Sequence, residues 1–180
     1  MARLSQIITR SGDSGQTGLA DGSRVDKDSP RIASLGDLDE LNAALGLLSV
    51  VLSGNELHDL IPPIQQHLFN LGGELALPGT SSTQSTHILA LEQSLEQLNQ
   101  HLPPLKEFVL PGGNGASAQA HVARALCRRC ERNLWGLSRI EVVNPESLKY
   151  LNRLSDLLFV IARTLARQHT TEETLWERKT

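Results

Sequence analysis

Three arginines and a glutamate share one face of a predicted helix. Successive helical residues turn by about 100°, so four side chains lie within an arc of about 100°: Arg124, Arg128, Glu131 and Arg132. A charged helix face is most often simply solvated. Arginine, however, carries a planar fork that binds carboxylate or phosphate through two hydrogen bonds, and a glycine-rich segment precedes this helix. We therefore expect the face to bind a polyanion.

A second set of anion-binding groups lies near the start of the chain. Glycines recur from Gly12 to Gly22 and leave backbone N–H groups open to a ligand. The segment supplies open backbone, hydroxyls, one cation and one carboxylate able to hold a metal ion, from Thr9, Arg10, Gly12, Asp13, Gly15 and Thr17. The P-loop pattern G-x-x-x-x-G-K-[ST] is absent. The spacing alone therefore indicates an anion loop and not a known nucleotide motif.

Two further polar stripes leave more than one interpretation open. Asp39 stands beside Asn42 on a predicted helix, where it would be solvated, cap the helix, or pair with an arginine of the same or another subunit. In the last helix a stripe of polar and aromatic residues faces away from the leucines. Ordinary amphipathic packing would explain about half of this pattern. The stripe consists of Asn152, Asp156, Phe159 and Arg163.

Acyl transfer, zinc hydrolysis and hydride transfer are disfavoured because their usual motifs are missing. The chain has no G-x-S-x-G elbow, no H-E-x-x-H pair and no G-x-G-x-x-G segment after a strand. Cys127 and Cys130 form a C-x-x-C spacing inside a strongly helical stretch, so helix positions explain them better than a redox or zinc site. With 17 basic and 20 acidic residues the net charge is −3, which disfavours nucleic acid as a partner.

The elements that position these residues are predicted to be helices, giving an all-α fold. Leucine and isoleucine recur at i, i+3 and i+4 in five stretches, near residues 31–53, 57–77, 88–98, 116–136 and 145–169. Prolines at 62 and 63 should distort or restart the second helix. Glycine-rich connections at 10–22 and 111–115 complete a five-helix bundle.

The length of 180 residues suits a single domain. We expect a loop segment over residues 1–30, the helical bundle over 31–170 and a tail over 171–180. The sequence has no apolar run long enough for a membrane span and no signal-peptide pattern at its start. The protein is therefore expected to be soluble and cytoplasmic, with no membrane association.

Seven stretches, in this order, resemble the PduO-type corrinoid (cob(I)alamin) adenosyltransferases. They are TRSGDSGQTGL (9–19), RVDK (24–27), GDLDELN (36–42), QHLFNLGGELA (66–76), FVLPGG (108–113), CRRCER (127–132) and YLNRLSD (150–156). The departures are Ser11 where threonine is usual, Ser14 where lysine is frequent and Cys130 where alanine is usual. They affect only the details of phosphate contact.

The resemblance implies an enzyme that transfers the 5′-deoxyadenosyl group of ATP to cobalt(I) of cobalamin or another corrinoid and releases triphosphate. It implies a homotrimer with ATP, accompanied by Mg²⁺, bound between subunits. ATP would contact Thr9, Arg10, Gly12, Asp13, Gly15, Thr17, Lys27, Arg128, Glu131, Arg132 and Asn152. Arg124 and Asp39 would form a salt bridge between subunits, and Phe108 would close over the lower face of the corrin.

The resemblance further implies a cob(II)alamin reductase as a partner, with an adenosylcobalamin-dependent enzyme as a candidate recipient of the product. Two rival interpretations remain. One is an ATP-sensing or corrinoid-escort protein without chemistry, which the retention of Arg128, Asn152 and Phe108 disfavours. The other is a purely structural bundle, in which the glycine-rich loops would have no purpose.

Overall fold

Five long helices form most of the chain, as predicted. The computed structural model describes residues 8, 10–168 and 173–177. The helices are α1 (Pro30–Val51), α2 (Ile61–Ala76), α3 (Ser85–Asn99), α4 (Gly115–Leu137) and α5 (Pro145–Arg167). Their bounds lie within a few residues of those predicted from leucine spacing.

Polar caps and prolines set where the helices begin. Asn114 and Asn144 each accept a backbone N–H bond in the first turn of α4 and α5. At the second helix, Pro62 and Pro63 supply no backbone donors. A short 3₁₀ turn, η1 (His58–Leu60), therefore precedes α2 in place of one continuous helix from residue 57.

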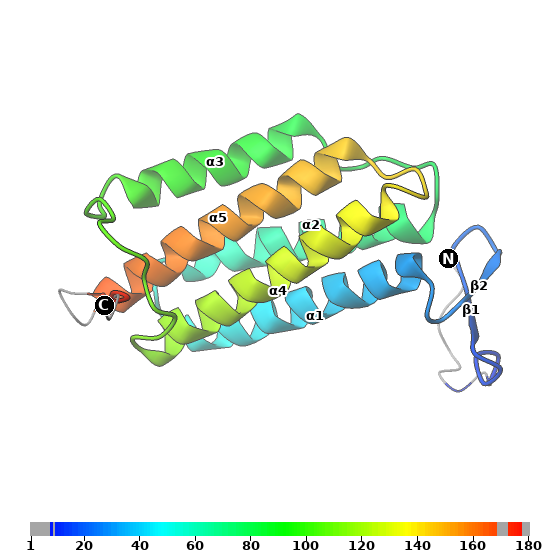
Figure 1. Ribbon diagram of the computed structural model, residues 1–180, viewed down its shortest axis with the longest axis horizontal. Helices are drawn as coiled ribbons and strands as arrows, with labels where there is room; N and C mark the ends of the chain where they lie inside the picture. Colours follow the sequence, from blue (N-terminus) through cyan, green and yellow to red (C-terminus); the bar gives the residue numbers. More distant parts are fainter. Residues whose placement is uncertain (1–7, 9, 169–172, 178–180) are drawn as a thin grey trace.

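The helices pack as one bundle around a leucine-rich core. Helix α1 contacts α2 and α4, and α5 contacts α4 and α3 (Figure 1). Leu41, Leu71 and Leu151 are among the fully buried side chains, and each such burial stabilises the fold by about 1.5–3 kcal/mol. Within the described residues, no helix is both long and apolar enough to cross a membrane.

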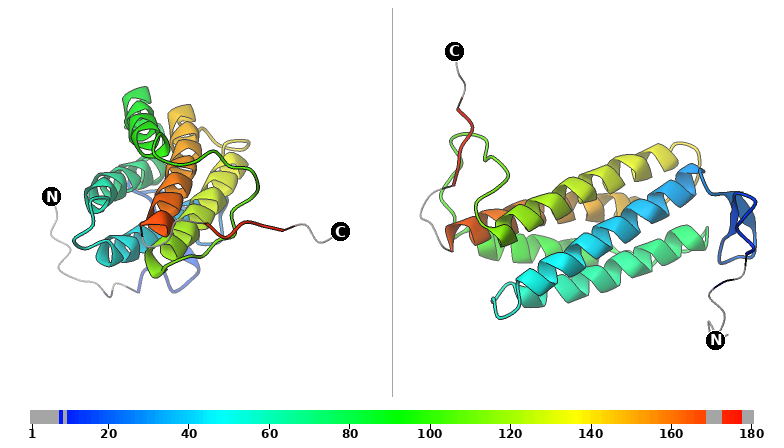
Figure 2. Two further views of the ribbon diagram at one scale, coloured as in Figure 1. Left: turned by 90° about the vertical axis from the view of Figure 1, so that its left-hand side faces the viewer. Right: turned by 90° about the horizontal axis from the view of Figure 1, so that it is seen from below.

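A small antiparallel sheet adds to the predicted all-helical fold. Strand β1 (Gln16–Gly18) pairs with β2 (Arg24–Asp26), with Thr17 opposite Val25. Strands of three residues are too short to leave a readable alternation in the sequence. This hairpin lies beyond the start of α1 at one end of the bundle (Figure 2), where the N–H of Ala20 donates to the carbonyl of Ala76 at 2.8 Å.

At the opposite end, two segments distant in sequence lie side by side (Figure 1). Val109, in the connection before α4, is paired in antiparallel fashion with Leu175. The N–H of Leu110 donates to the carbonyl of Thr174 at 2.8 Å, and that of Trp176 donates to Phe108 at 2.7 Å. Each end of the bundle therefore carries a short extended structure outside the helical core.

The two cysteines are buried in α4 and form no disulfide. Burial raises the pKa of Cys130 to about 12 and raises that of Cys127 well above its usual range. Both thiols therefore stay protonated at neutral pH, as core residues do. This agrees with the prediction that helix packing explains the C-x-x-C spacing.

Candidate active site

Three of the predicted site residues line one cavity. A hollow of about 530 Å³ is bounded by Phe108 from the connection before α4 and by Arg124 and Arg128 from α4, with α5 forming a further wall. Arg124 and Arg128 are one helical turn apart and so point the same way. The cavity therefore combines an aromatic ring with two cationic groups.

Arg124 is held in place with part of its binding capacity unused. Its guanidinium lies 5.8 Å from the centre of the Phe159 ring, a cation–π distance. Burial, with a smaller effect from Arg128, lowers the pKa of Arg124, although an arginine side chain remains charged at neutral pH. Its Nε atom is buried and has no hydrogen-bond partner among the described residues. A buried donor without a partner is costly, so this site favours an acceptor from outside the chain.

Beyond Arg128 the charged face continues across α4 to α5. Asn152 donates to the carboxylate of Glu131 at 3.0 Å and so joins two residues predicted to contact ATP. Arg132 donates to the backbone carbonyl of Arg128 at 3.2 Å. The guanidinium of Arg128 is exposed, with no hydrogen bond or ion pair in the described part of the chain. One contiguous face thus offers free positive charge beside the cavity.

Phe108 does not plug the core. Its side chain is 78% exposed, although it lines the cavity. The following Pro-Gly-Gly turn requires glycine at position 113, because its φ is 91° and an added Cβ there would contact Ala166 at 3.4 Å. The backbone on either side of Val109 is held by the bonds to Thr174 and Trp176. An exposed aromatic ring on an anchored segment is suited to contacting a large ligand.

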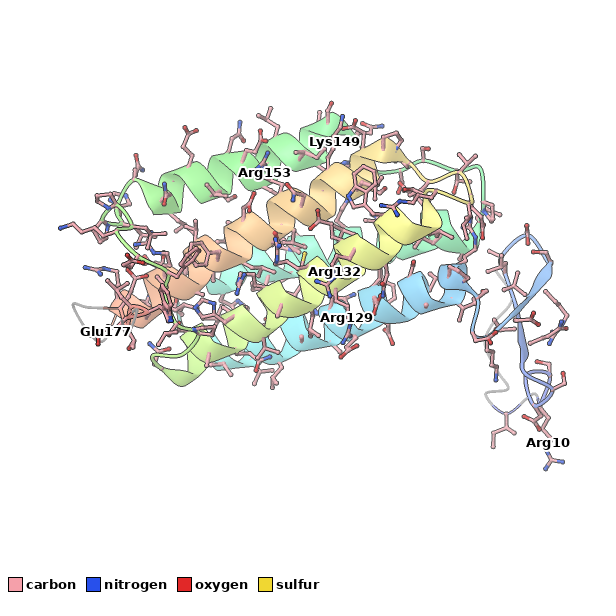
Figure 3. All side chains as sticks on the ribbon, viewed as in Figure 1. Arg10, Arg129, Arg132, Lys149, Arg153 and Glu177 are labelled. Atoms are coloured by element: carbon pink, nitrogen blue, oxygen red, sulfur yellow. The ribbon has the colours of Figure 1, made fainter. Side chains whose placement is uncertain are left out.

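The N-terminal loop residues lie at the far end of the bundle from this cavity. Figure 3 shows Arg10 beyond the start of α1 and Arg132 in the C-terminal half of α4. The loop is compact: Gly15 donates to Gly12 at 3.2 Å, and the N–H of Lys27 donates to Gly15 at 2.9 Å. Asp13 and Thr17 belong to the same segment, whereas Thr9 lies outside the described residues.

Two contacts shape the N-terminal loop. The ammonium of Lys27 lies so close to Gly12 that an added Cβ would meet it at 2.9 Å. Arg24 donates to the carbonyls of Ser11 and Gln16 at 2.6 and 3.1 Å. Arg24 stands in the RVDK stretch but was not predicted to have a role. By bonding to both carbonyls, Arg24 holds the residues on either side of Gly12 and Gly15 together.

Asp39 occupies a third location. It is exposed and lines a separate hollow between α1 and α2 with Phe69 and Gly72. In the described part of a single chain no ion pair joins Asp39 to Arg124. The ion pairs between α1 and α4 in the described part of the chain are made instead by Arg129, which binds Asp37 at 3.1 Å and also bonds Glu40.

Some residues that line the cavity were not among the predicted site residues. Asp156 and Phe159 of α5 lie in its wall. Asp156 is held by Arg153, whose Nη1 donates to it at 2.8 Å. The mixed stripe of the last helix already contained Asp156 and Phe159, but nothing in the spacing showed that this stripe faces Arg124. Lys106 also lines the cavity, and no sequence signal pointed to it.

No metal site is preformed within the described residues. No group of three His, Cys, Asp or Glu side chains gathers there. Mg²⁺ usually keeps several waters and binds through one or two carboxylates plus substrate phosphates. The isolated carboxylates of Asp13 and Glu131 fit that mode and do not fit an all-protein metal cage.

Comparison with known proteins gives the family. The sequence profile described as cobalamin adenosyltransferase matches residues 7–165. A cobalamin adenosyltransferase of Cupriavidus metallidurans is 48% identical over 178 residues, covering 98% of this chain and 97% of its own. A corrinoid adenosyltransferase of Citrobacter freundii is 44% identical, covering 88% and 93%.

Solved structures agree with this assignment. A phenylalanine-to-alanine variant of the PduO-type ATP:corrinoid adenosyltransferase from Lactobacillus reuteri, complexed with cobalamin and ATP, has a TM-score of 0.91 at 32% identity, covering 96% of this chain and 100% of that one. An arginine-to-lysine variant complexed with ATP has a TM-score of 0.89 at 33% identity, covering 95% and 100%. The protein whose cavity joins Phe108 to Arg124 and Arg128 is therefore a member of the cobalamin adenosyltransferase family.

Proposed function

We propose that this chain transfers the 5′-deoxyadenosyl group of ATP to the cobalt(I) of cobalamin or a related corrinoid. The observation that carries the proposal is the cavity lined both by the exposed Phe108 ring and by Arg128, whose guanidinium has no partner among the described residues. A corrin ring needs an apolar surface and a triphosphate needs fixed positive charge. Both are present side by side, and membership of the family gives the reaction.

The reaction requires little acid–base chemistry from the protein. Cobalt(I) is the nucleophile: it forms a bond to C5′ of ATP while the bond from C5′ to the triphosphate oxygen breaks, and triphosphate leaves with the electron pair. The protein must hold the two substrates in line and stabilise the charge that develops on the leaving oxygens. Arg128 and Arg132 are placed to do this because both project from the exposed face of α4.

Phe108 would act on the corrin. An aromatic side chain beneath the ring displaces the lower axial ligand and leaves cobalt(II) four-coordinate, which eases its reduction to cobalt(I). Support comes from the exposure of the Phe108 side chain and from the backbone hydrogen bonds that Phe108 and Leu110 make with Trp176 and Thr174. A cob(II)alamin reductase is the proposed source of the electron, and an adenosylcobalamin-dependent enzyme is a candidate recipient of the product.

We also propose that ATP binds between subunits of a homotrimer. In one chain, the loop that carries Arg10 lies beyond the start of α1, whereas Arg129 and Arg132 lie on α4, within the length of the bundle (Figure 3). A neighbouring copy can bring its loop to this face and its Asp39 to the unpartnered Nε of Arg124. Mg²⁺ would arrive with the triphosphate, within reach of Asp13 or Glu131, and would neutralise charge on the phosphates.

The direct test is incubation with ATP and chemically reduced cobalamin under anaerobic conditions, followed by optical spectra. Formation of adenosylcobalamin together with one triphosphate per turnover is expected. An ATP-sensing or corrinoid-escort protein would bind ATP or corrinoid with no product, and a structural bundle would bind neither. Either result would refute the proposed function.

A further inference from the structure

A buried ion pair lies behind the cavity, outside the residues assigned to ATP or corrin. The Nε atom of Arg163 in α5 donates to one carboxylate oxygen of Glu173 at 2.7 Å, and its Nη2 donates to the other at 2.9 Å. The two side chains are only 4% and 5% exposed. Arg167 adds a longer contact of 3.4 Å. This two-pronged geometry is the strongest form of an arginine–carboxylate contact.

The arginine partners of Glu173 stabilise the ionised form of its carboxylate. Burial alone would raise the pKa of Glu173, but hydrogen bonds and charge from Arg163 and Arg167 outweigh it and lower the pKa. His121 of α4 also faces this carboxylate, and its own pKa is lowered, chiefly by burial. Glu173 is therefore ionised at neutral pH.

Glu173 begins the segment that holds Phe108. Immediately after it, Thr174 accepts from the N–H of Leu110, and the N–H of Trp176 donates to the carbonyl of Phe108. These two bonds enclose the bridge between Val109 and Leu175. The position of Phe108 is therefore tied to the position of Glu173 over only a few residues.

Arg163 also holds the other side of the same connection. Its Nη2 donates to the carbonyl of Pro103 at 2.9 Å. Pro103 lies near the start of the connection that carries Phe108 to α4. One guanidinium thus fixes both the segment that contains Phe108 and the segment that pairs with it.

We propose that Arg163 and Glu173 are positioning residues for the corrinoid, forming a clamp that fixes Phe108 at the cavity. The inference rests on the proposed function, since it assigns a purpose to the placement of Phe108. A buried ion pair is weak support for stability as such, because apolar residues of similar size often serve equally well. This pair joins α5 only to segments outside the leucine core. Its removal should therefore release those segments and leave the bundle folded.

The first test is Arg163→Met, which keeps the bulk of the side chain and removes its charge. Glu173 can then move into water because it lies in an extended segment outside the helices. We expect faster hydrogen exchange at the amides of Leu110 and Trp176, and a larger five-coordinate fraction of cobalt(II) with ATP bound. We expect kcat/KM for the corrinoid to fall by about tenfold or more, with KM for ATP changed less than about twofold.

The matched control is Arg31→Met, which removes a buried arginine that also binds a glutamate and a backbone carbonyl, at the other end of the bundle. It should leave the exchange of Leu110 and Trp176 and the cobalt(II) coordination unchanged. If Arg163→Met behaves in the same way, the clamp proposal is wrong.

A rescue experiment separates positioning from general destabilisation. Val109→Cys and Leu175→Cys, added to Arg163→Met, place two thiols at bridge partners, whose Cβ atoms are about 4.5–5.5 Å apart in such pairs. With cobalt(II) corrinoid and ATP bound and no reductant added, the oxidised protein should recover the four-coordinate cobalt(II) fraction and slow amide exchange, whereas the reduced form of the same protein should not. Slow exchange without recovery of the four-coordinate fraction would overturn the proposal.

Failure of the clamp and failure of the proposed function give different results. If the wild-type protein forms no adenosylcobalamin, the proposed function fails whatever the variants do. If the wild-type protein is active and Arg163→Met opens the paired segments without changing the corrinoid kinetics, the function stands and the clamp is refuted.

Discussion

Both ends of the bundle use a buried arginine to fasten a segment that lies outside the helices. At the hairpin end, Arg31 of α1 binds Glu141 through Nε at 2.8 Å and the carbonyl of Leu75 at 2.7 Å. At the cavity end, Arg163 binds Glu173 and the carbonyl of Pro103. The chemistry of the two contacts is nearly the same.

The partners differ in where they lie. The Glu141 side chain is 39% exposed and belongs to the turn between α4 and α5, so Arg31 joins parts of the bundle itself. The Glu173 side chain is 5% exposed and belongs to the segment paired with Phe108. The same contact therefore serves helix assembly at one end and placement of a ligand-contacting residue at the other. Variants at the two ends should therefore differ: those at the hairpin end should change the free energy of unfolding, and those at the cavity end should change the reaction with the corrinoid.

The largest effect is expected at the proposed interface between the cavity of one copy and α1 of another. Asp39→Ala or Arg124→Ala should strand one charge of a buried pair, which costs about 3–5 kcal/mol. Light scattering should show weaker trimers, and titration should show altered ATP affinity. If both single variants assemble and bind ATP as the wild type does, the proposed bridge does not exist.

The second effect concerns Phe108, at the cavity end. Phe108→Ala should lower turnover about a hundredfold when a protein reductase supplies the electron, because cobalt(II) would stay five-coordinate. The melting temperature should barely change, since the ring is 78% exposed. ATP binding should also be normal. A large fall in melting temperature with an unchanged four-coordinate cobalt(II) signal would place Phe108 in the core.

The third effect lies at the hairpin end. Arg31→Met should destabilise the protein by about 2–3 kcal/mol, because it leaves the buried carbonyl of Leu75 without its charged donor. Urea unfolding of this variant and of Arg163→Met gives the comparison directly. Arg163→Met should be the less destabilised of the two. The opposite order would remove the distinction between the two ends.

The smallest effect is a dependence of stability on pH. Burial, with a lesser effect from the His87 charge, lowers the pKa of His67 to about 4 from its usual 6.5. Between pH 6.5 and 4 the His67 ring is protonated in the unfolded chain but neutral in the folded chain. The free energy of unfolding is therefore highest above about pH 6.5 and decreases as the pH falls toward 4. We expect a loss of at most about 2 kcal/mol between pH 7 and 5.

The control for this prediction is His67→Phe, which removes the titrating ring. Its unfolding free energy should fall less between pH 7 and 5 than that of the wild type. Equal pH dependence in the two proteins would show that other groups are responsible. His121, whose pKa is also lowered by burial, is the first of these and lies at the cavity end.

Leucine spacing was enough to predict the helices because each buried stripe recurs over several turns. The hairpin was missed because its strands have three residues each. On α4, helical spacing correctly grouped Arg124 with Arg128, but it could not show that Asp156 of α5 faces them. The Arg163–Glu173 contact was out of reach because it depends on how the chain returns after α5, where no periodicity constrains it.

In the proposed trimer, the loop around Lys27 and the face around Arg128 form one site only between different copies of the chain. Lys27→Ala and Arg128→Ala should each be nearly inactive, and the two variants should be dissociated, mixed in equal amounts and reassembled. In a closed ring with random mixing, about a quarter of the interfaces combine an intact loop with an intact face. The reassembled mixture should therefore recover about a quarter of wild-type turnover, whereas a mixture as inactive as its components would contradict a site shared between copies.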